Sequence, residues 1–295
     1  MPLAGTNSLS EFMATKYLGA ADVRRLASQL GVTPTKKWGQ NFVIDPNTIR
    51  HIVDEAHVTA DDIVVEIGPG LGSLTLGLLD KAKQVVVIEI DERLAGQLPE
   101  TVTEFAPDLA ENLLVLNTDA LAVDALPVQP TKLVANLPYN VSVPVLLHFL
   151  QKFPSIQEAL VMVQAEVGER LAAAPGSKIY GVPSVKAAWY GKVTKVSTIK
   201  PGVFWPAPNV DSVLVRLVRH DQLPSESNQQ EVFAIVDAAF SQRRKTLRSA
   251  LSGLLKSAQR SEQILLRAGI NPSERGEQLE LDAFIRIAQA AQEVG

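Results

Sequence analysis

The segment Ile63-Val64-Val65-Glu66-Ile67-Gly68-Pro69-Gly70-Leu71-Gly72 decides the fold, because a short apolar run ends there in a glycine-rich turn. Residues 74–81 follow with helical spacing, and later apolar runs alternate with further helical stretches. This rhythm is typical of a parallel sheet covered by helices on both faces. The later runs lie at 85–88, 113–116, 132–135 and 158–164.

The pattern changes after residue 184. Residues 184–199 and 213–218 are rich in valine and alternate in part, so we expect antiparallel strands that close the edge of the sheet. Residues 221–230 are polar and form a candidate linker, and apolar residues then recur at helical spacing to the end.

The chain therefore divides into four parts. We expect an N-terminal extension with a helix over residues 1–31, an α/β domain over 32–220, the linker over 221–230 and a helical domain over 231–295. The length of 295 residues agrees with this division, because single cores stop growing near ~250–300 residues.

Composition excludes several classes of protein. The chain has no cysteine, which excludes disulfides, thiolate metal sites and a cysteine nucleophile. Its four histidines have no partner at metal-ligand spacing, so we expect no metal. No apolar run is long enough to span a membrane, and the first thirty residues do not read as a signal peptide. These features favour a cytoplasmic protein without a membrane partner.

Charge is distributed unevenly along the chain. The formal net charge of −4 argues weakly against a nucleic-acid partner. Residues 160–260 nevertheless contain 14 Lys and Arg against 7 Asp and Glu, which gives this stretch +7 and leaves −11 for the remainder. One region is therefore positive enough to attract phosphates, although long chains also fluctuate in local charge.

The glycine-rich turn indicates a nucleoside-binding loop. Glycines let a ligand approach main-chain N–H groups, and such loops lie outside the carboxyl ends of strands. A dinucleotide loop would carry a third glycine where Ser73 stands. Here Gly68, Gly70 and Gly72 occupy every second position, which resembles the S-adenosylmethionine loop of class I methyltransferases. We therefore expect their Rossmann-like fold, with a mostly parallel seven-stranded sheet.

Two acids follow the next two strands. Glu89 comes directly after the second strand and can accept hydrogen bonds from both ribose hydroxyls; Asp91 is the second choice. Asp119 follows the third strand, at a position that resembles the class I acid contacting the amino group of the cofactor adenine. A solvated strand-end acid and a turn-capping aspartate are the respective alternatives.

Asn136-Leu137-Pro138-Tyr139 ends the fourth strand and suits an exocyclic amine. The lone pair of such an amine is delocalised into its ring, and two acceptors on its N–H groups would localise it. The Asn136 side chain and the Leu137 carbonyl can be those acceptors, with Pro138 stiffening the turn. Tyr139 offers a flat face on which a base can stack. The alternative is an ordinary turn, which the two preceding acid positions disfavour.

Further segments resemble the KsgA/RsmA family of small-subunit ribosomal RNA adenine dimethyltransferases. The resemblance runs from about Lys36 to Leu251, and its first, proline-rich and last segments are the most specific. The segments are Gly39-Gln40-Asn41-Phe42-Val43, 65–72, 87–91, 136–142, 177–181, Pro206-Ala207-Pro208-Asn209-Val210-Asp211-Ser212 and Phe240-Ser241-Gln242-Arg243-Arg244-Lys245-Thr246-Leu247-Arg248.

The resemblance implies dimethylation of N6 on two adjacent adenosines, in a hairpin loop near the 3′ end of 16S ribosomal RNA, during small-subunit biogenesis. The partner would be the immature 30S particle, and we expect a monomer. Phe204 matches an aromatic expected on the second face of the target base, although it can also be a core residue. The implied cofactor contacts are Asn41, Val43, Gly68, Glu89, Asp119 and Asn136.

A cluster of cations opens the expected helical domain. Arg243, Arg244, Lys245 and Arg248 are interpreted as lying on its first long helix, with Arg244 and Arg248 on one face. Positive charge in this stretch fits phosphate contacts, so we predict that these residues bind RNA. A solvated basic face is the alternative.

Two other functions remain open. A large-subunit ribosomal RNA adenine methyltransferase of the macrolide-resistance type would share the pocket, but the proline-rich and basic segments argue against it. A mainly non-catalytic ribosome-assembly factor could use the same fold. A nicotinamide dehydrogenase is disfavoured by Ser73.

Overall fold

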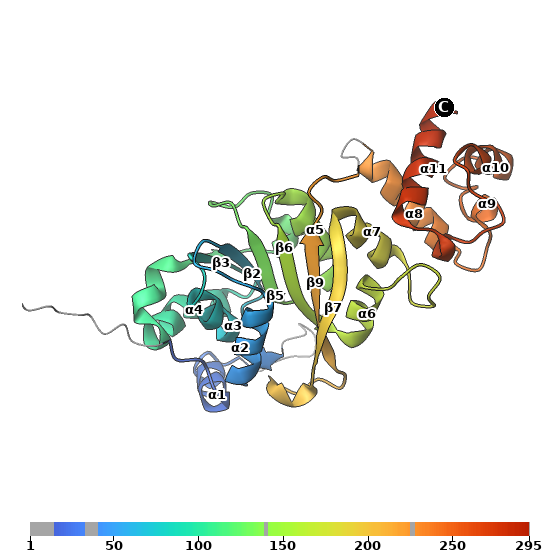
Figure 1. Ribbon diagram of the computed structural model, residues 1–295. Coiled ribbons are helices and arrows are strands. Elements are labelled where there is room, and N and C mark those ends of the chain that lie inside the picture. Colours follow the sequence, from blue (N-terminus) through green and yellow to red (C-terminus); the bar gives the residue numbers. More distant parts are fainter. Residues whose placement is uncertain (1–14, 33–40, 139–140, 225–227, 295) are drawn as a thin grey trace, which may run out of the picture.

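The computed structural model describes residues 15–32, 41–138, 141–224 and 228–294 (Figure 1). A seven-stranded sheet forms its centre, in the order β4-β3-β2-β5-β6-β9-β7. Strands β2 to β6 run parallel, while β9 is antiparallel to both β6 and β7. The predicted mostly parallel seven-stranded sheet is therefore confirmed. The seven strands are β2 (Ile63–Ile67), β3 (Gln84–Glu89), β4 (Leu113–Asn117), β5 (Lys132–Asn136), β6 (Glu158–Gln164), β7 (Gly191–Ile199) and β9 (Ser212–Arg219).

A second, two-stranded sheet lies outside this one. Its strands, β1 (Phe42–Val43) and β8 (Phe204–Trp205), pair in antiparallel fashion, with Val43 opposite Phe204. This small sheet joins segments from the beginning and end of the α/β region, which the sequence did not predict.

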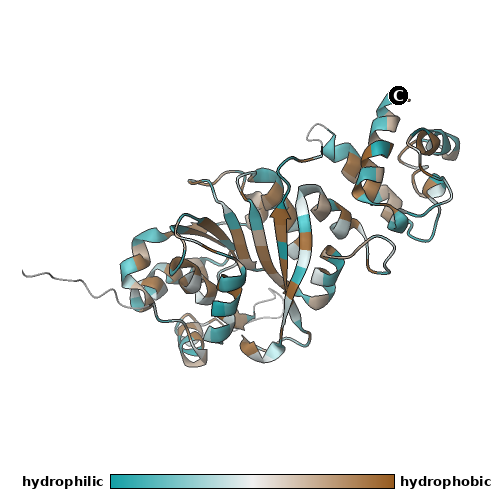
Figure 2. Ribbon diagram, in the orientation of Figure 1, coloured by the Kyte–Doolittle hydropathy of each residue, from teal (hydrophilic) through white to brown (hydrophobic). Residues whose placement is uncertain are grey.

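Helices cover both faces of the main sheet, because neighbouring residues of each buried strand point to opposite sides. Val64 packs with the N-terminal helices, whereas Val65 packs with those that follow β5. Figure 2 shows the resulting hydrophobic strands between helices of mixed polarity. The first group is α1 (Ala20–Gln29), α2 (Pro46–Glu55), α3 (Ser73–Leu79) and α4 (Glu92–Phe105), and the second is α5 (Ser142–Lys152), α6 (Ala165–Leu171) and α7 (Val182–Tyr190).

The expected strand over residues 184–199 is wrong in its first half, where α7 runs to Tyr190. The Ser184 hydroxyl accepts a hydrogen bond from the Gly181 N–H at the start of this helix, and Val185 and Trp189 are buried four residues apart. The other valines of the range, Val193 and Val196, lie in the strand that follows, so the strand pattern was extended too far toward the N-terminus. The strand begins at Gly191, where a Cβ would lie 2.1 Å from the Val218 carbonyl oxygen.

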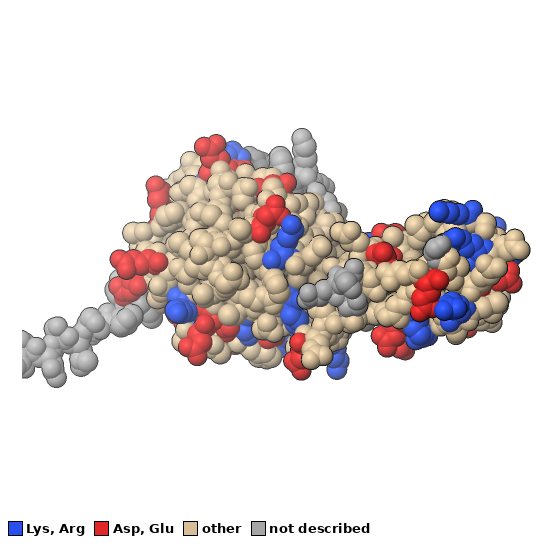
Figure 3. All heavy atoms as spheres, turned by 90° about the horizontal axis from the view of Figure 1, so that it is seen from above, with Lys and Arg blue, Asp and Glu red and all other residues tan. Residues whose placement is uncertain are grey.

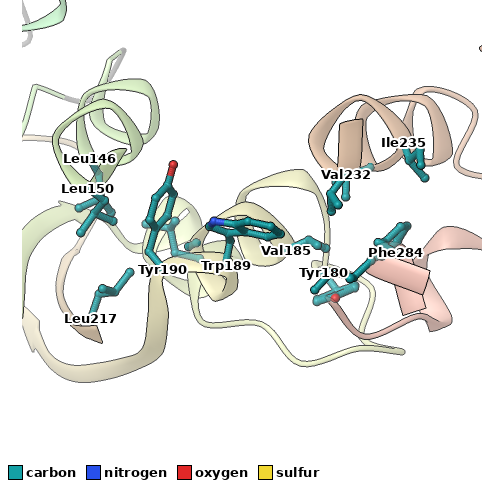
Figure 4. Close-up of a cluster of buried hydrophobic side chains, with 14 of the residues drawn as sticks. Leu146, Leu150, Tyr180, Val185, Trp189, Tyr190, Leu217, Val232, Ile235 and Phe284 are labelled. Atoms are coloured by element: carbon teal, nitrogen blue, oxygen red, sulfur yellow. The ribbon is translucent and has the colours of Figure 1, made fainter. Parts of the chain in front are cut away.

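Helices α8 (Gln229–Ser241), α9 (Leu247–Ala250), α10 (Ala258–Arg267) and α11 (Leu281–Glu293) form the C-terminal end of the chain. Their core is continuous with that of the sheet, because Trp189 and Tyr180 of the α7 region pack against this group (Figure 4). The Trp189 and Phe233 ring centroids are 5.8 Å apart, and the Tyr180 hydroxyl donates to the Leu279 carbonyl at 2.9 Å. The division of the chain at 221–230 remains a proposal.

Candidate active site

A cavity of about 430 Å³ lies at the carboxyl ends of β2 to β5. All described residues that were predicted to bind the cofactor line it, together with Leu137 and Pro138 of the predicted amine pocket. The alternation of strands and helices explains this convergence, because the carboxyl ends of parallel strands meet at one edge of the sheet. The predicted residues at the cavity are Asn41, Val43, Gly68, Gly70, Glu89, Asp119, Asn136, Leu137 and Pro138.

The turn after β2 depends on its glycines. Gly68, Gly70 and Gly72 have φ angles of +67°, +60° and +95°, a region that L side chains rarely adopt. At Gly70 a Cβ would also lie 2.8 Å from the Phe42 ring. The alternate glycines therefore let β1 approach the turn closely.

Glu89 faces this turn. Its carboxylate accepts hydrogen bonds from the Gly70 N–H at 3.2 Å and the Asp91 N–H at 3.0 Å. The side chain is buried, and burial raises the pKa of the Glu89 carboxyl. Each carboxylate oxygen has two acceptor sites, so these bonds leave capacity for ligand hydroxyls.

Asp91 and Asp119 both line the cavity, and their carboxylates also accept hydrogen bonds from main-chain N–H groups. Asp91 caps α4 by accepting from the Arg93 N–H at 3.0 Å, and it forms an ion pair with the Arg93 guanidinium at 2.8 Å. Asp119 accepts from the Leu121 N–H at 2.9 Å. Because Asp91 is already paired with the Arg93 guanidinium, Glu89 stays our first candidate for the ribose hydroxyls.

Asn136 lies at the end of β5, where its Nδ2 donates to the Asn41 carbonyl oxygen at 3.1 Å. This bond uses the amide nitrogen as the donor and so leaves the acceptor role to the side-chain oxygen. The Leu137 N–H donates to the Met162 carbonyl at 3.1 Å, which anchors the turn to β6. Tyr139 lies outside the described residues, so its stacking role stays a prediction.

Phe204 lies in the core rather than at the rim of the cavity. It is 3% exposed and packs in the cluster that contains Phe42 and Leu71. The sequence left a rim position and a core position open, and this structure has the core position. A contact between Phe204 and the target base stays a prediction.

Glu66 is a cavity residue to which sequence reasoning assigned no role. It is 2% exposed and accepts a hydrogen bond from the Thr75 hydroxyl at 2.6 Å. Burial, partly offset by Thr75 and assisted by the nearby Glu89 charge, raises the pKa of Glu66 to about 8. The available signal was a single acid inside an otherwise apolar strand.

The predicted RNA-binding cations do not lie on one long helix, which corrects that interpretation. α8 ends at Ser241, and Arg243, Arg244 and Lys245 occupy the turn before α9. The reason is local: Leu247 is fully buried and its N–H donates to the Glu274 carbonyl at 2.7 Å, which redirects the chain.

These four cations differ in their surroundings. Arg243 donates to the Glu277 carboxylate at 3.0 Å and the Lys178 carbonyl at 2.6 Å, while Arg248 donates to Glu262 at 2.9 Å. Arg244 and Lys245 are exposed and form no ion pair with a described carboxylate. Figure 3 shows blue and red side chains interspersed over the C-terminal helices, so the face seen in this view is mixed rather than uniformly basic.

Neither a metal centre nor a membrane span is found in the part of the chain that the structure describes. Over those ranges, no group of three or more His, Asp or Glu side chains could hold a metal ion. Within the same ranges, every helix is too short or too polar to cross a membrane.

Comparisons with known proteins agree with the geometry. Residues 32–293 match the family model described as "Ribosomal RNA adenine dimethylase". A "Ribosomal RNA small subunit methyltransferase A" of Paenarthrobacter aurescens (strain TC1) is 59% identical, over 92% of this chain and 93% of the relative. The protein of that name from Corynebacterium glutamicum (strain R) is 55% identical, over 97% and 99%.

Two solved structures share this fold. A dimethyladenosine transferase from Plasmodium falciparum has a TM-score of 0.69 at 27% identity, over 82% of this chain and 94% of that one. The 23S rRNA methyltransferase ErmE has a TM-score of 0.63 at 26% identity, over 85% and 100%.

Proposed function

Because the chain belongs to the ribosomal RNA adenine dimethylase family, we propose that it dimethylates N6 of adenosines in small-subunit (16S) ribosomal RNA, using S-adenosylmethionine. The single observation that carries the proposal is the meeting of Asn136 with Glu89 and the glycine turn at one cavity. An amine pocket and a nucleoside site thereby share one space, as direct transfer between two bound substrates requires.

The chemical types of the cavity residues fit S-adenosylmethionine. The glycine turn lets a ligand approach the main chain closely, Glu89 can accept from ribose hydroxyls, and Asp119 lies within the same lining. S-adenosylmethionine supplies an electrophilic methyl group. Asn41 and Val43 would cover this cofactor, because they reach the cavity from the segment before α2.

Asn136 and Leu137 would activate the target amine. In the first transfer the Asn136 side-chain oxygen and the Leu137 carbonyl would each accept one N–H, which localises the nitrogen lone pair toward the methyl group. The monomethylated amine has one N–H left, so in the second transfer one of the two acceptors would hold it. Alignment of this kind can supply ~7–11 kcal/mol of a barrier. The aminium that forms is acidic, so no side chain needs to remove a proton before transfer.

The RNA would be held by exposed cations. Arg244 and Lys245 are our candidates for direct phosphate contacts, because no described carboxylate neutralises them. Arg243 and Arg248 are paired with Glu277 and Glu262, so they contribute less free charge. The base must leave its stack to reach the cavity, which favours a hairpin loop.

The finer parts of the proposal concern the substrate particle. We expect two adjacent adenosines in the hairpin near the 3′ end, an immature 30S particle as substrate, a monomeric enzyme and a cytoplasmic location.

The alternative is modification of large-subunit RNA, which the likeness to ErmE makes worth testing. Relatives near 59% identity named for the small subunit weigh more than a structure at 26%. The test incubates the chain with labelled S-adenosylmethionine and either immature small subunits or large-subunit RNA, then maps the bases by primer extension. Label confined to large-subunit RNA would overturn the proposal, as would no label on either.

A further inference from the structure

The two-stranded sheet β1–β8 connects the cofactor side of the cavity to the segment that carries Phe204. Phe42 pairs with Trp205 and Val43 with Phe204, and the Ile44 N–H adds a bond to the Val203 carbonyl at 2.9 Å. The Phe42 and Trp205 rings stack with centroids 6.4 Å apart. Only the β1 side of this pair lies among the residues that line the cavity.

Three different parts of the fold hold the cover segment Asn41–Val43 against the cavity. Asn136, at the end of β5, donates to the Asn41 carbonyl at 3.1 Å. Gly70 leaves room for the Phe42 ring, which a Cβ would meet at 2.8 Å. Ser73, the first residue of α3, donates its hydroxyl to the Val43 carbonyl at 2.8 Å.

We propose that Ser73 is a positioning residue for the cover segment and that the β1–β8 sheet couples cofactor binding to RNA binding. The proposal rests on the proposed function and deepens it. Ser73 is 6% exposed, and it supplies the donor for a carbonyl beside the cavity. A buried acceptor that loses its donor favours a rearranged backbone, and here that backbone is the cofactor cover.

The pairing of β1 with β8 explains how cofactor binding and RNA binding would be coupled. Asn41, Phe42 and Val43 line the cavity, so a ligand bound there would favour the position of β1 that brings them against it. Hydrogen bonding and stacking pass that preference to Phe204 and Trp205 on β8. Phe204 is buried, so RNA would reach β8 at Trp205, which is partly exposed. By linkage, RNA bound there would strengthen cofactor binding by the same factor.

The experiment measures the dissociation constant of S-adenosylhomocysteine by calorimetry, with and without a hairpin RNA of the small-subunit 3′ end. For the native chain we expect RNA to tighten binding about fivefold or more, a typical coupling. Ser73→Ala should weaken S-adenosylhomocysteine binding about tenfold, raise KM for S-adenosylmethionine more than it lowers kcat, and remove most of the coupling.

Ser261→Ala is the matched control. The Ser261 hydroxyl also donates to a backbone carbonyl, that of Ser257, at 2.9 Å, and it is fully buried in α10 away from the cavity. This variant should lower thermal stability and leave both the affinity and the coupling unchanged. A similar loss of affinity in both variants would overturn the positioning role, because the effect would be one of general stability.

Trp205→Ala tests the role of the β1–β8 sheet through a change on β8. It also replaces Ser73→Ala as the test if that variant does not fold. Trp205 does not line the cavity, yet it stacks on Phe42, so its loss should also weaken S-adenosylhomocysteine binding and the coupling. Native affinity in Ser73→Ala overturns the role of Ser73, and intact coupling in Trp205→Ala overturns the role of the sheet. Failure of the proposed function would be recognised separately, by lack of methyl transfer in the native chain.

Discussion

The cavity at the strand ends and the cationic turn at 243–245 differ in how they hold their functional groups. At the cavity, Glu89 and Asn136 are fixed by hydrogen bonds to backbone atoms. At the turn, Arg244 and Lys245 are exposed and extend from a segment between two helices. The first arrangement suits chemistry that tolerates little displacement, and the second suits phosphates, which attract cations over longer distances. Substitutions at the cavity should therefore cost more activity than substitutions at the turn.

Asn136→Ala should reduce kcat for methyl transfer about a hundredfold or more, because one acceptor for the reacting amine is lost. RNA affinity measured by filter binding should remain close to native. Asn136→Asp is the companion variant, since it keeps an acceptor but cannot donate to the Asn41 carbonyl. Survival of methyl transfer in Asn136→Ala would remove this residue from the reaction.

Glu89→Gln should weaken S-adenosylhomocysteine binding roughly tenfold, because hydrogen bonds to a charged group are worth ~1.5–3 kcal/mol. Asp91→Asn serves as the matched comparison, and its effect should be smaller because Asp91 is paired with Arg93. Calorimetry measures the S-adenosylhomocysteine affinity of both variants. A larger loss of affinity in Asp91→Asn would make Asp91, and not Glu89, the residue that binds the ribose.

Arg244→Gln and Lys245→Gln should each lower the slope of log affinity against log salt by about one unit, as expected for one lost phosphate contact. Affinity at a fixed salt concentration should fall a few-fold, with kcat at saturating RNA unchanged. Glu277→Gln is the control, because it frees Arg243 from its ion pair without removing a cation. An unchanged salt slope in both arginine and lysine variants would show that RNA binds elsewhere.

Glu66 should make stability fall as pH rises. Its pKa is about 8 in the folded chain against an ordinary value of 4.5, so its favourable contribution is complete below pH 4.5 and is lost as pH rises through 8. Between pH 7 and pH 8 we expect a loss of about 1 kcal/mol, since one pKa unit corresponds to ~1.4 kcal/mol. Glu66→Gln should flatten this decline in denaturant melts; an equal decline in the variant would assign it to other groups.

Strand ends were predictable from the sequence for a physical reason. Each buried parallel strand is a short apolar run, so Glu89 and Asn136 could be assigned to strand termini by counting. The cover segment at Asn41 and Val43 came only from the family resemblance. Its attachment to β8 could not be predicted, because two-residue strands carry no periodic signal.

Two of the secondary-structure predictions were wrong because contacts distant in sequence decided the structure. Residues 182–190 bury Val185 and Trp189 on one face of a helix, and Val185 together with the valines of the next strand was counted as one strand. The cations at 243–248 were assigned to a long helix because helical spacing continues on both sides of them. Tertiary contacts of Leu247 decided that turn, and no local pattern reports such contacts.

The shared core between α7 and the C-terminal helices has a consequence for substrate choice. Trp189 and Tyr180 bind the two parts together through Phe233 and Phe240, so the separation between Lys245 and Asn136 is set by packing. We therefore expect the distance between these two residues to stay nearly constant while RNA binds. We expect the protein to select an adenosine by the distance between that base and the phosphate bound at Lys245, as well as by the chemistry of the base itself.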